Sequence, residues 1–143
     1  MSDSQQPTYP PRSVIALLRL EGVLVLVASL AAYQVLGGNW WVFALLILAP
    51  DLSMLGMLGG DRLGAKIYNA AHTYLLPGVL AGIAWLANPS LIPLAVIWIA
   101  HIGGDRALGY GLKCGDFHHT HLGRIGPPKT RAAKPVPNED VEP

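Results

Sequence analysis

The sequence predicts an all-α fold, a four-helix transmembrane bundle. The chain has 143 residues, of which 52% are hydrophobic and only 13% charged, far from the composition of soluble domains. The apolar residues gather in four runs, each near the roughly 20 residues that a helix needs to cross about 30 Å of hydrocarbon. None of the runs alternates as a strand would, and a membrane accepts only helices or closed barrels.

The four expected spans are joined by short links and flanked by polar, proline-rich segments. The membrane domain covers residues 13–126, with spans at about 13–36, 40–58, 63–87 and 91–112. Arg19 and Glu21 interrupt the first run, which is also long for a signal peptide, so we expect it to be retained. Residues 1–12 are a polar N-terminal segment, and residues 127–143 are expected to be a disordered tail.

Positive charges predict the orientation of the spans. The links between spans one and two and between spans three and four carry no charge, whereas Arg or Lys residues flank the other ends. By the positive-inside rule both termini are cytoplasmic, in a multi-pass protein of the bacterial inner membrane. The net charge of +1 provides no basic cluster for nucleic acid, so membrane lipid is the expected partner. Cys114 is the single cysteine, which excludes an internal disulfide.

Every span carries ionisable side chains, each of which costs roughly 2.5–3.5 kcal/mol on insertion into a membrane. Counted from the cytoplasmic ends, Glu21, Asp51, His72 and His101 lie roughly 10–15 Å inside, at about 1.5 Å per residue. Asp105 follows His101 by one helical turn on the same face. We therefore expect these side chains to meet at one level of the bundle.

Two carboxylates and two imidazoles suit a divalent metal such as zinc, iron or manganese. The expected ligands are Asp51, His72, His101 and Asp105. Whether the protein is an enzyme is open, but hydrolysis suits such a site, because the metal lowers the pKa of bound water towards about 7. Glu21 is the candidate general base.

Explanations without a metal also stay open. Asp51 follows Pro50 and can cap amide groups that the proline leaves free. His72 can bond to a carbonyl freed by a kink at Pro77, and the carboxylate of the following helical turn can hold His101 in one tautomer. The cluster is then a structural network in a non-enzymatic accessory subunit with a protein partner at its cytoplasmic rim, or part of a proton path. The oligomeric state is not predicted.

Three lesser features lie outside this cluster. The tract from His118 to His121, H-H-T-H, follows the last span, and short histidine tracts can bind metal. Gly78 and Gly82 are four residues apart, which would let span three approach a neighbouring helix closely. Arg19 is near enough to the inner interface to extend its charged end to water.

Four motifs resemble, in order, those of a family of small bacterial four-span membrane proteins known as a domain of unknown function. They are PDLSMLG (50–56), YNAAHTY (68–74), AHIGGDRALGYGLK (100–113) and THLGRIG (120–126). The resemblance covers about Ala16 to Gly126 and implies no established reaction. It implies motif positions at Asp51, Tyr68, Asn69, His72, His101, Asp105, Arg106, Tyr110 and His121.

The segment that begins at Cys114 departs from this family pattern, in which a more aromatic loop is expected. A looser likeness, to predicted membrane-bound metal-dependent hydrolases, rests on Asp and His at the ends of short spans. The N-terminal histidine motif of those proteins is missing here, so the likeness concerns residue types alone.

Overall fold

The computed structural model describes residues 9–114 and 118–126, so the expected disordered tail at 127–143 lies outside the described residues. The helical elements, in order, are α1 (Arg12–Val35), α2 (Trp40–Leu46), the 3-10 helix η1 (Ala49–Gly59), α3 (Asp61–Ala71), α4 (Leu75–Ala87), the short 3-10 helix η2 (Pro89–Leu91) and α5 (Ile92–Leu108). After α5, the strands β1 (His119–Thr120) and β2 (Gly123–Arg124) form a small antiparallel hairpin. The all-α prediction is confirmed.

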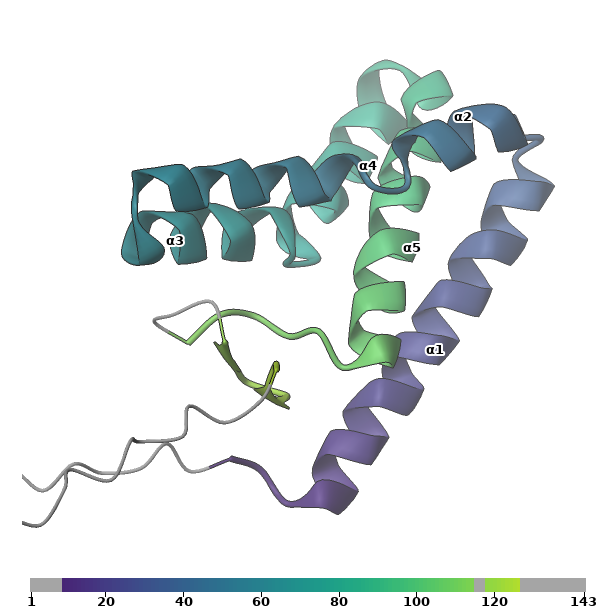
Figure 1. Cartoon of the computed structure of the whole chain (residues 1–143). Helices are drawn as coiled ribbons and strands as arrows, with labels where there is room; N and C mark the ends of the chain where they lie inside the picture. The colour runs from purple at the N-terminus through teal and green to yellow at the C-terminus, as the bar shows by residue number, and fades with distance from the viewer. Residues whose placement is uncertain (1–8, 115–117, 127–143) are drawn as a thin grey trace, which may run out of the picture.

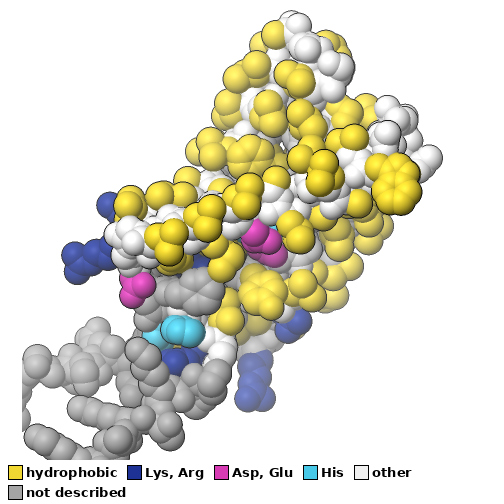
Figure 2. All heavy atoms as spheres, turned by 45° about the horizontal axis from the view of Figure 1, so that its top comes forward, with side chains coloured by type: hydrophobic (Ala, Val, Ile, Leu, Met, Phe, Trp, Pro, Cys, Tyr) yellow, Lys and Arg dark blue, Asp and Glu magenta, His cyan; other side chains and the backbone are white. Residues whose placement is uncertain are grey.

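Four helical stretches are long and apolar enough to cross a membrane. They are Arg12–Val35, Trp40–Gly59, Asp61–Ala87 and Pro89–Leu108. Large apolar side chains such as Trp41, Leu58 and Leu86 are exposed on these stretches, and Figure 2 shows hydrophobic side chains over most of one face. The last helix is shorter than predicted, because Gly109 adopts a left-handed φ of 96° and ends it.

The first and last long helices, α1 and α5, pack side by side and antiparallel (Figure 1). A Cβ added to Gly22 would lie 2.6 Å from the Ala107 nitrogen, and one added to Gly103 would lie 2.8 Å from the Leu26 nitrogen. The two backbones therefore approach as closely as glycine allows. Arg19 Nε donates to the Ala107 carbonyl at 2.9 Å, so this side chain caps the end of α5.

The second and third spans are interrupted, unlike the first and the fourth. Span two changes from α2 to η1 next to Pro50, which has no amide hydrogen to donate. Span three is interrupted after α3, and the Thr73 hydroxyl accepts from the Leu75 amide at 3.2 Å where α4 begins. As a result, η1 and α3 lie side by side and run across the direction of α5, while α4 packs against α5 (Figure 1).

Side chains of α5 supply hydrogen bonds to the interrupted end of α3. Inside a membrane, carbonyl groups freed by such a break need partners from the protein. Trp98 Nε1 donates to the Ala71 carbonyl at 2.7 Å, and Arg106 Nη2 donates to the His72 carbonyl at 3.4 Å. The break in span three is therefore held against α5, and this contact positions the candidate site.

Candidate metal centre

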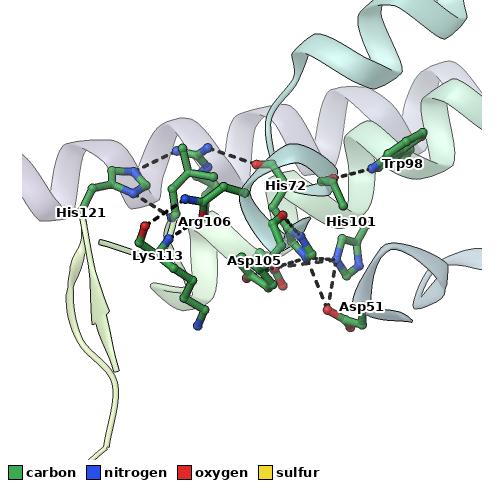
Figure 3. Close-up of polar contacts among 12 residues, drawn as sticks. Asp51, His72, Trp98, His101, Asp105, Arg106, Lys113 and His121 are labelled. Atoms are coloured by element: carbon green, nitrogen blue, oxygen red, sulfur yellow. Dashed lines mark hydrogen bonds and ion pairs between the residues drawn. The ribbon is translucent and has the colours of Figure 1, made fainter. Parts of the chain in front are cut away.

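Two imidazoles and two carboxylates meet where the interrupted spans contact α5 (Figure 3). The Nε2 atoms of His72 and His101 are 3.2 Å apart. His72 Nε2 lies 3.4 Å from Asp51 Oδ1 and 3.5 Å from Asp105 Oδ2, and His101 Nε2 lies 3.6 and 3.7 Å from the same two oxygens. All four atoms lie within 4.8 Å of one another.

Three separate elements supply these four side chains. Asp51 is the third residue of η1, directly after the proline at the bend of span two. His72 ends α3 at the break in span three. His101 and Asp105 are one turn apart on α5, which places both on the face that meets the two interruptions. The four expected metal ligands are thus brought together, whereas Glu21, which was expected at the same level, is not part of the group.

The group is closed around the imidazoles and more open at Asp51. The side chains of His72 and His101 are each 4% exposed, that of Asp105 is 18% exposed and that of Asp51 is 38% exposed. Access from outside therefore reaches the Asp51 carboxylate first.

Tyr68 fixes the orientation of His72. His72 Nδ1 lies 2.9 Å from the Tyr68 carbonyl, which can only accept, so Nδ1 carries the proton and the Nε2 lone pair faces the group. The Tyr68 ring stacks on the His72 ring at 3.7 Å between centroids, and its hydroxyl donates to Asp105 Oδ2 at 3.4 Å. His72 was expected to contact a carbonyl freed by a kink at Pro77. It contacts the Tyr68 carbonyl instead, one helical turn earlier in the chain.

The chain beyond α5 is fastened over this region by Asn69. Asn69 Nδ2 donates to the Lys113 carbonyl at 2.9 Å, and the Lys113 amide donates to Asn69 Oδ1 at 2.6 Å. The Lys113 ammonium lies 4.7 Å from the centre of the Tyr68 ring. Asn69 therefore joins the loop after α5 to the helix that carries His72.

His121 holds the same loop against Arg106. The Arg106 guanidinium, through Nη1, lies 2.9 Å from His121 Nε2, and the Leu112 amide donates to His121 Nδ1 at 2.9 Å. Burial, together with the nearby Arg106 charge, lowers the pKa of His121 below its usual range. His118 Nδ1 contacts the Ile125 carbonyl at 3.1 Å. These contacts give two histidines of the H-H-T-H tract structural roles.

Besides Tyr68, Asn69, Arg106 and His121, two more expected site residues, Glu21 and Tyr110, lie outside the four-residue group. Glu21 is exposed on α1 and lines a separate cavity of about 110 Å³ with Tyr74 and Arg106. Tyr110 follows the end of α5 and is exposed. The role of Glu21 as general base stays a prediction.

Sequence reasoning did not include Trp98 or Lys113 among the site residues. Trp98 precedes His101 by three residues and so lies on the same helix face. That spacing is a usable signal, although the acceptor of its hydrogen bond, the Ala71 carbonyl, belongs to another span. No sequence signal indicates that Lys113 lies over Tyr68, because the contact depends on the path of the loop.

Comparison with known proteins identifies a family but no relative of known activity. No curated protein and no solved structure matches the chain. Residues 15–125 match the family described as domain of unknown function DUF4260, a range that includes all four side chains of the group. The match agrees with the resemblance carried by the motifs and covers most of the chain, so the protein belongs to the DUF4260 family.

Proposed function

We propose that the protein binds a divalent metal ion within the membrane through Asp51, His72, His101 and Asp105. The observation that carries this proposal is the spacing of the four ligand atoms. A tetrahedral ion with bonds of roughly 2.0–2.2 Å to nitrogen and oxygen has ligand atoms about 3.3–3.6 Å apart. Five of the six distances, those that involve an imidazole nitrogen, span 3.2–3.7 Å, and all six are within 4.8 Å. Zinc, iron and manganese all accept this donor set.

Charge also supports a cation at this position. With neutral histidines and ionised carboxylates, the four side chains carry a net charge of −2 beside apolar helices, with the Arg106 guanidinium and the Lys113 ammonium close by. Two gathered carboxylates are costly in such surroundings, and a divalent ion bound between them offsets their charge directly. The Tyr68 carbonyl adds the outer contact that metal-binding histidines usually make through their second nitrogen.

We further propose that the centre supports hydrolysis of an ester or phosphoester. A bound divalent ion would polarise the substrate oxygen and make water a better nucleophile at neutral pH. In this reaction, the oxygen of water bonds to the carbonyl carbon or to phosphorus, the bond to the alcohol oxygen breaks, and that oxygen takes a proton. The exposed edge of the group at Asp51 supports access of a substrate.

Metal content of the protein, purified without a histidine tag, tests the first step. We expect a single zinc, iron or manganese ion per chain in the wild type and its loss in His72→Ala, His101→Ala and Asp51→Asn, because each variant removes one ligand. His118→Ala removes a histidine outside the group and is the matched control. A wild type without metal, or a His101→Ala variant that keeps it, would refute the proposal.

Turnover on esters and phosphoesters tests the second step. We expect hydrolysis that disappears on chelation and returns with the metal, and that is absent in the ligand variants. Glu21→Gln tests the predicted general base: lower turnover with unchanged metal content would support that role. Full metal content without turnover on a broad panel would leave a metal-binding protein and exclude the hydrolase.

A structural network in a non-enzymatic accessory subunit is the second candidate. It is favoured by polar contacts that join the elements without a metal, such as Trp98 to Ala71 and Asn69 to Lys113. In that case, His101→Ala and Asp105→Asn would lower thermal stability while the wild type carries no metal. A protein partner at the cytoplasmic rim would then be sought by cross-linking.

We propose that both termini face the cytoplasm, with the protein in the bacterial inner membrane, as the charges of the links indicate. Cys114 is exposed after α5 and gives a native probe of this orientation. A maleimide that does not cross membranes should label Cys114 in inverted vesicles but not in intact spheroplasts. Ser90→Cys, at an exposed position in the link between spans three and four, should give the opposite pattern in a Cys114→Ser background. Reversed labelling would overturn the orientation.

A further inference from the structure

An apolar cavity of about 380 Å³ lies beside the four-residue group. Its walls come from η1, α3, α4 and α5 and include Pro50, Ser53, Ala71, Leu80, Leu94 and Trp98. Small-molecule sites occupy roughly 300–1,000 Å³, so this volume is at the lower end of the range. The cavity is distinct from the smaller one that Glu21 lines.

The cavity is lined by residues that neighbour the candidate ligands in the sequence, although none of the four ligands lines it. Pro50 directly precedes Asp51, and Ala71 directly precedes His72. Trp98 lies one turn before His101 on α5, and Figure 3 shows it on the side of His101 away from Arg106 and His121. A molecule in the cavity would therefore lie within one residue or one helical turn of three of the ligands.

The lining is almost entirely hydrocarbon, with one polar exception. Ser53 Oγ is buried and has no hydrogen-bond partner within the described part of the chain. A buried hydroxyl without a partner is unfavourable, and a polar atom of a ligand would relieve this cost. Ser53 follows Asp51 by two residues, so that atom would lie near the carboxylate end of the cavity.

Exposed apolar side chains border the cavity. Leu94, on its wall, is 37% exposed, and Leu48, beside the lining residue Ala49, is 65% exposed. A molecule dissolved in the bilayer can therefore enter from the side without crossing water. The four candidate ligands offer oxygen and nitrogen atoms to a cation. A cation held there would attract an anionic or ester oxygen of the molecule.

Resting on the proposed metal-dependent hydrolysis, we propose that this cavity selects the substrate. It holds the hydrocarbon chain of a single-chain amphiphile and places the ester or phosphoester at the polar end of that chain beside Asp51, His72, His101 and Asp105. The small volume favours one chain over the two chains of a bilayer phospholipid. The hydrocarbon chain packs against the apolar lining of the cavity, and its polar end binds the metal.

Photo-labelling of the metal-loaded full chain in lipid nanodiscs tests this selection. The probe is lauryl phosphate with a diazirine in the middle of its chain, and labelled residues are located by mass spectrometry. We expect label on peptides that contain Ala71, Leu80 or Trp98. Unlabelled lauryl phosphate should compete, whereas methyl phosphate should not. Label spread evenly over the outer faces of the helices, or competition by methyl phosphate alone, would overturn the inference.

Two tryptophan variants at adjacent positions, one lining the cavity and one not, test the role of the cavity. Leu80→Trp fills the cavity from α4 and should reduce labelling about tenfold or more, since the larger side chain occupies the space that the probe chain needs. Val79→Trp places the same side chain at the next position, which is 51% exposed and does not line the cavity, and should change little. Equal labelling of the two variants would contradict the inference.

Metal content separates failure of this inference from failure of the proposed function. Both tryptophan variants should keep the wild-type metal content, because neither residue is a ligand. Metal-loaded protein that hydrolyses acetate and laurate esters equally well would refute the cavity as the source of selection and leave the hydrolase standing. Protein without metal would refute the proposed function itself. The comparison of ester chain lengths uses the wild type alone, so it does not depend on the folding of a variant.

Discussion

The α1–α5 pair and the η1–α3 pair are both built from apolar sequence, but the first consists of continuous helices and the second belongs to interrupted spans. The first pair consists of continuous helices whose backbones touch through Gly22 and Gly103 (Figure 1). The second pair belongs to spans that are interrupted next to Pro50 and after Ala71. Two of the four candidate ligands, Asp51 and His72, lie at those interruptions. The continuous helices thus provide the support, and the interruptions provide two of the ligands.

The difference shows how a membrane protein can tolerate interrupted helices. Carbonyl groups released at the end of α3 are not left in lipid, because Trp98 and Arg106 of the continuous helix α5 donate to them. The same helix carries His101 and Asp105. One rigid element therefore both stabilises the break and completes the group of ligands.

The largest effect is expected from a change in the continuous pair. Gly22→Val would place carbon atoms against the backbone of Ala107, which cannot move without shifting α5. We expect a loss of about 3 kcal/mol or more of stability, or failure to fold. Thermal unfolding in detergent measures the loss.

A glycine away from any helix contact is the control for that change. Gly78 and Gly82, the pair that the sequence suggested for a close approach, have no atom of the described residues within 4 Å of an added Cβ. Gly78→Ala should therefore leave stability unchanged or raise it by up to about 1 kcal/mol, as alanine does in helices. If Gly22→Val were as harmless as Gly78→Ala, the close packing of α1 on α5 would be wrong.

An intermediate effect is expected from the interrupted pair. Asn69→Leu removes both hydrogen bonds to the Lys113 backbone and leaves those groups without their partner. We expect a loss of about 1–3 kcal/mol and faster amide hydrogen exchange at Lys113, whereas α1 should exchange at the wild-type rate. Slow exchange at Lys113 in the variant would show that other contacts hold the loop.

The smallest effect is a change in pH dependence caused by His121. Burial and the Arg106 guanidinium lower the pKa of His121 in the folded chain, so the unfolded chain binds a proton that the folded chain does not. The contribution of His121 to stability is therefore fully present above about pH 6.5, the pKa of histidine in the unfolded chain. It is lost as the pH falls from there through the lower pKa of His121 in the folded chain. An imidazolium, moreover, cannot accept from the Leu112 amide.

His121→Gln measures this contribution by difference. The variant should lose less stability than the wild type between about pH 6.5 and 5. Melting curves at several pH values, recorded for both proteins under the same conditions, give the comparison. Parallel curves would mean that His121 does not titrate in this range.

The membrane fold and the members of the group could be predicted from particular residues. Ionisable side chains in apolar runs are so costly that Asp51, His72, His101 and Asp105 stood out, and counting residues brought spans two, three and four together correctly but wrongly added Glu21 of span one. The interruptions could not be predicted in full. Pro50 signalled the bend of span two, but nothing in the order of residues indicated that α3 would end at His72.

The contacts that hold the interruptions were also beyond prediction. The bond from Trp98 to Ala71 joins two spans, and the close approach at Gly22 rather than at Gly78 depends on which helices become neighbours. Sequence periodicity describes one helix at a time, so such choices between partners require the tertiary structure.

X-ray absorption at the edge of the bound metal tests the central claim most directly. For an ion held by Asp51, His72, His101 and Asp105, the spectrum should show nitrogen and oxygen neighbours at about 2.0–2.2 Å and outer-shell scattering from two imidazoles. His101→Ala, which is expected to lose the metal, should show no such spectrum. A sulfur neighbour at about 2.3 Å, which only cysteine or methionine would supply, or a spectrum without imidazole scattering would contradict the account.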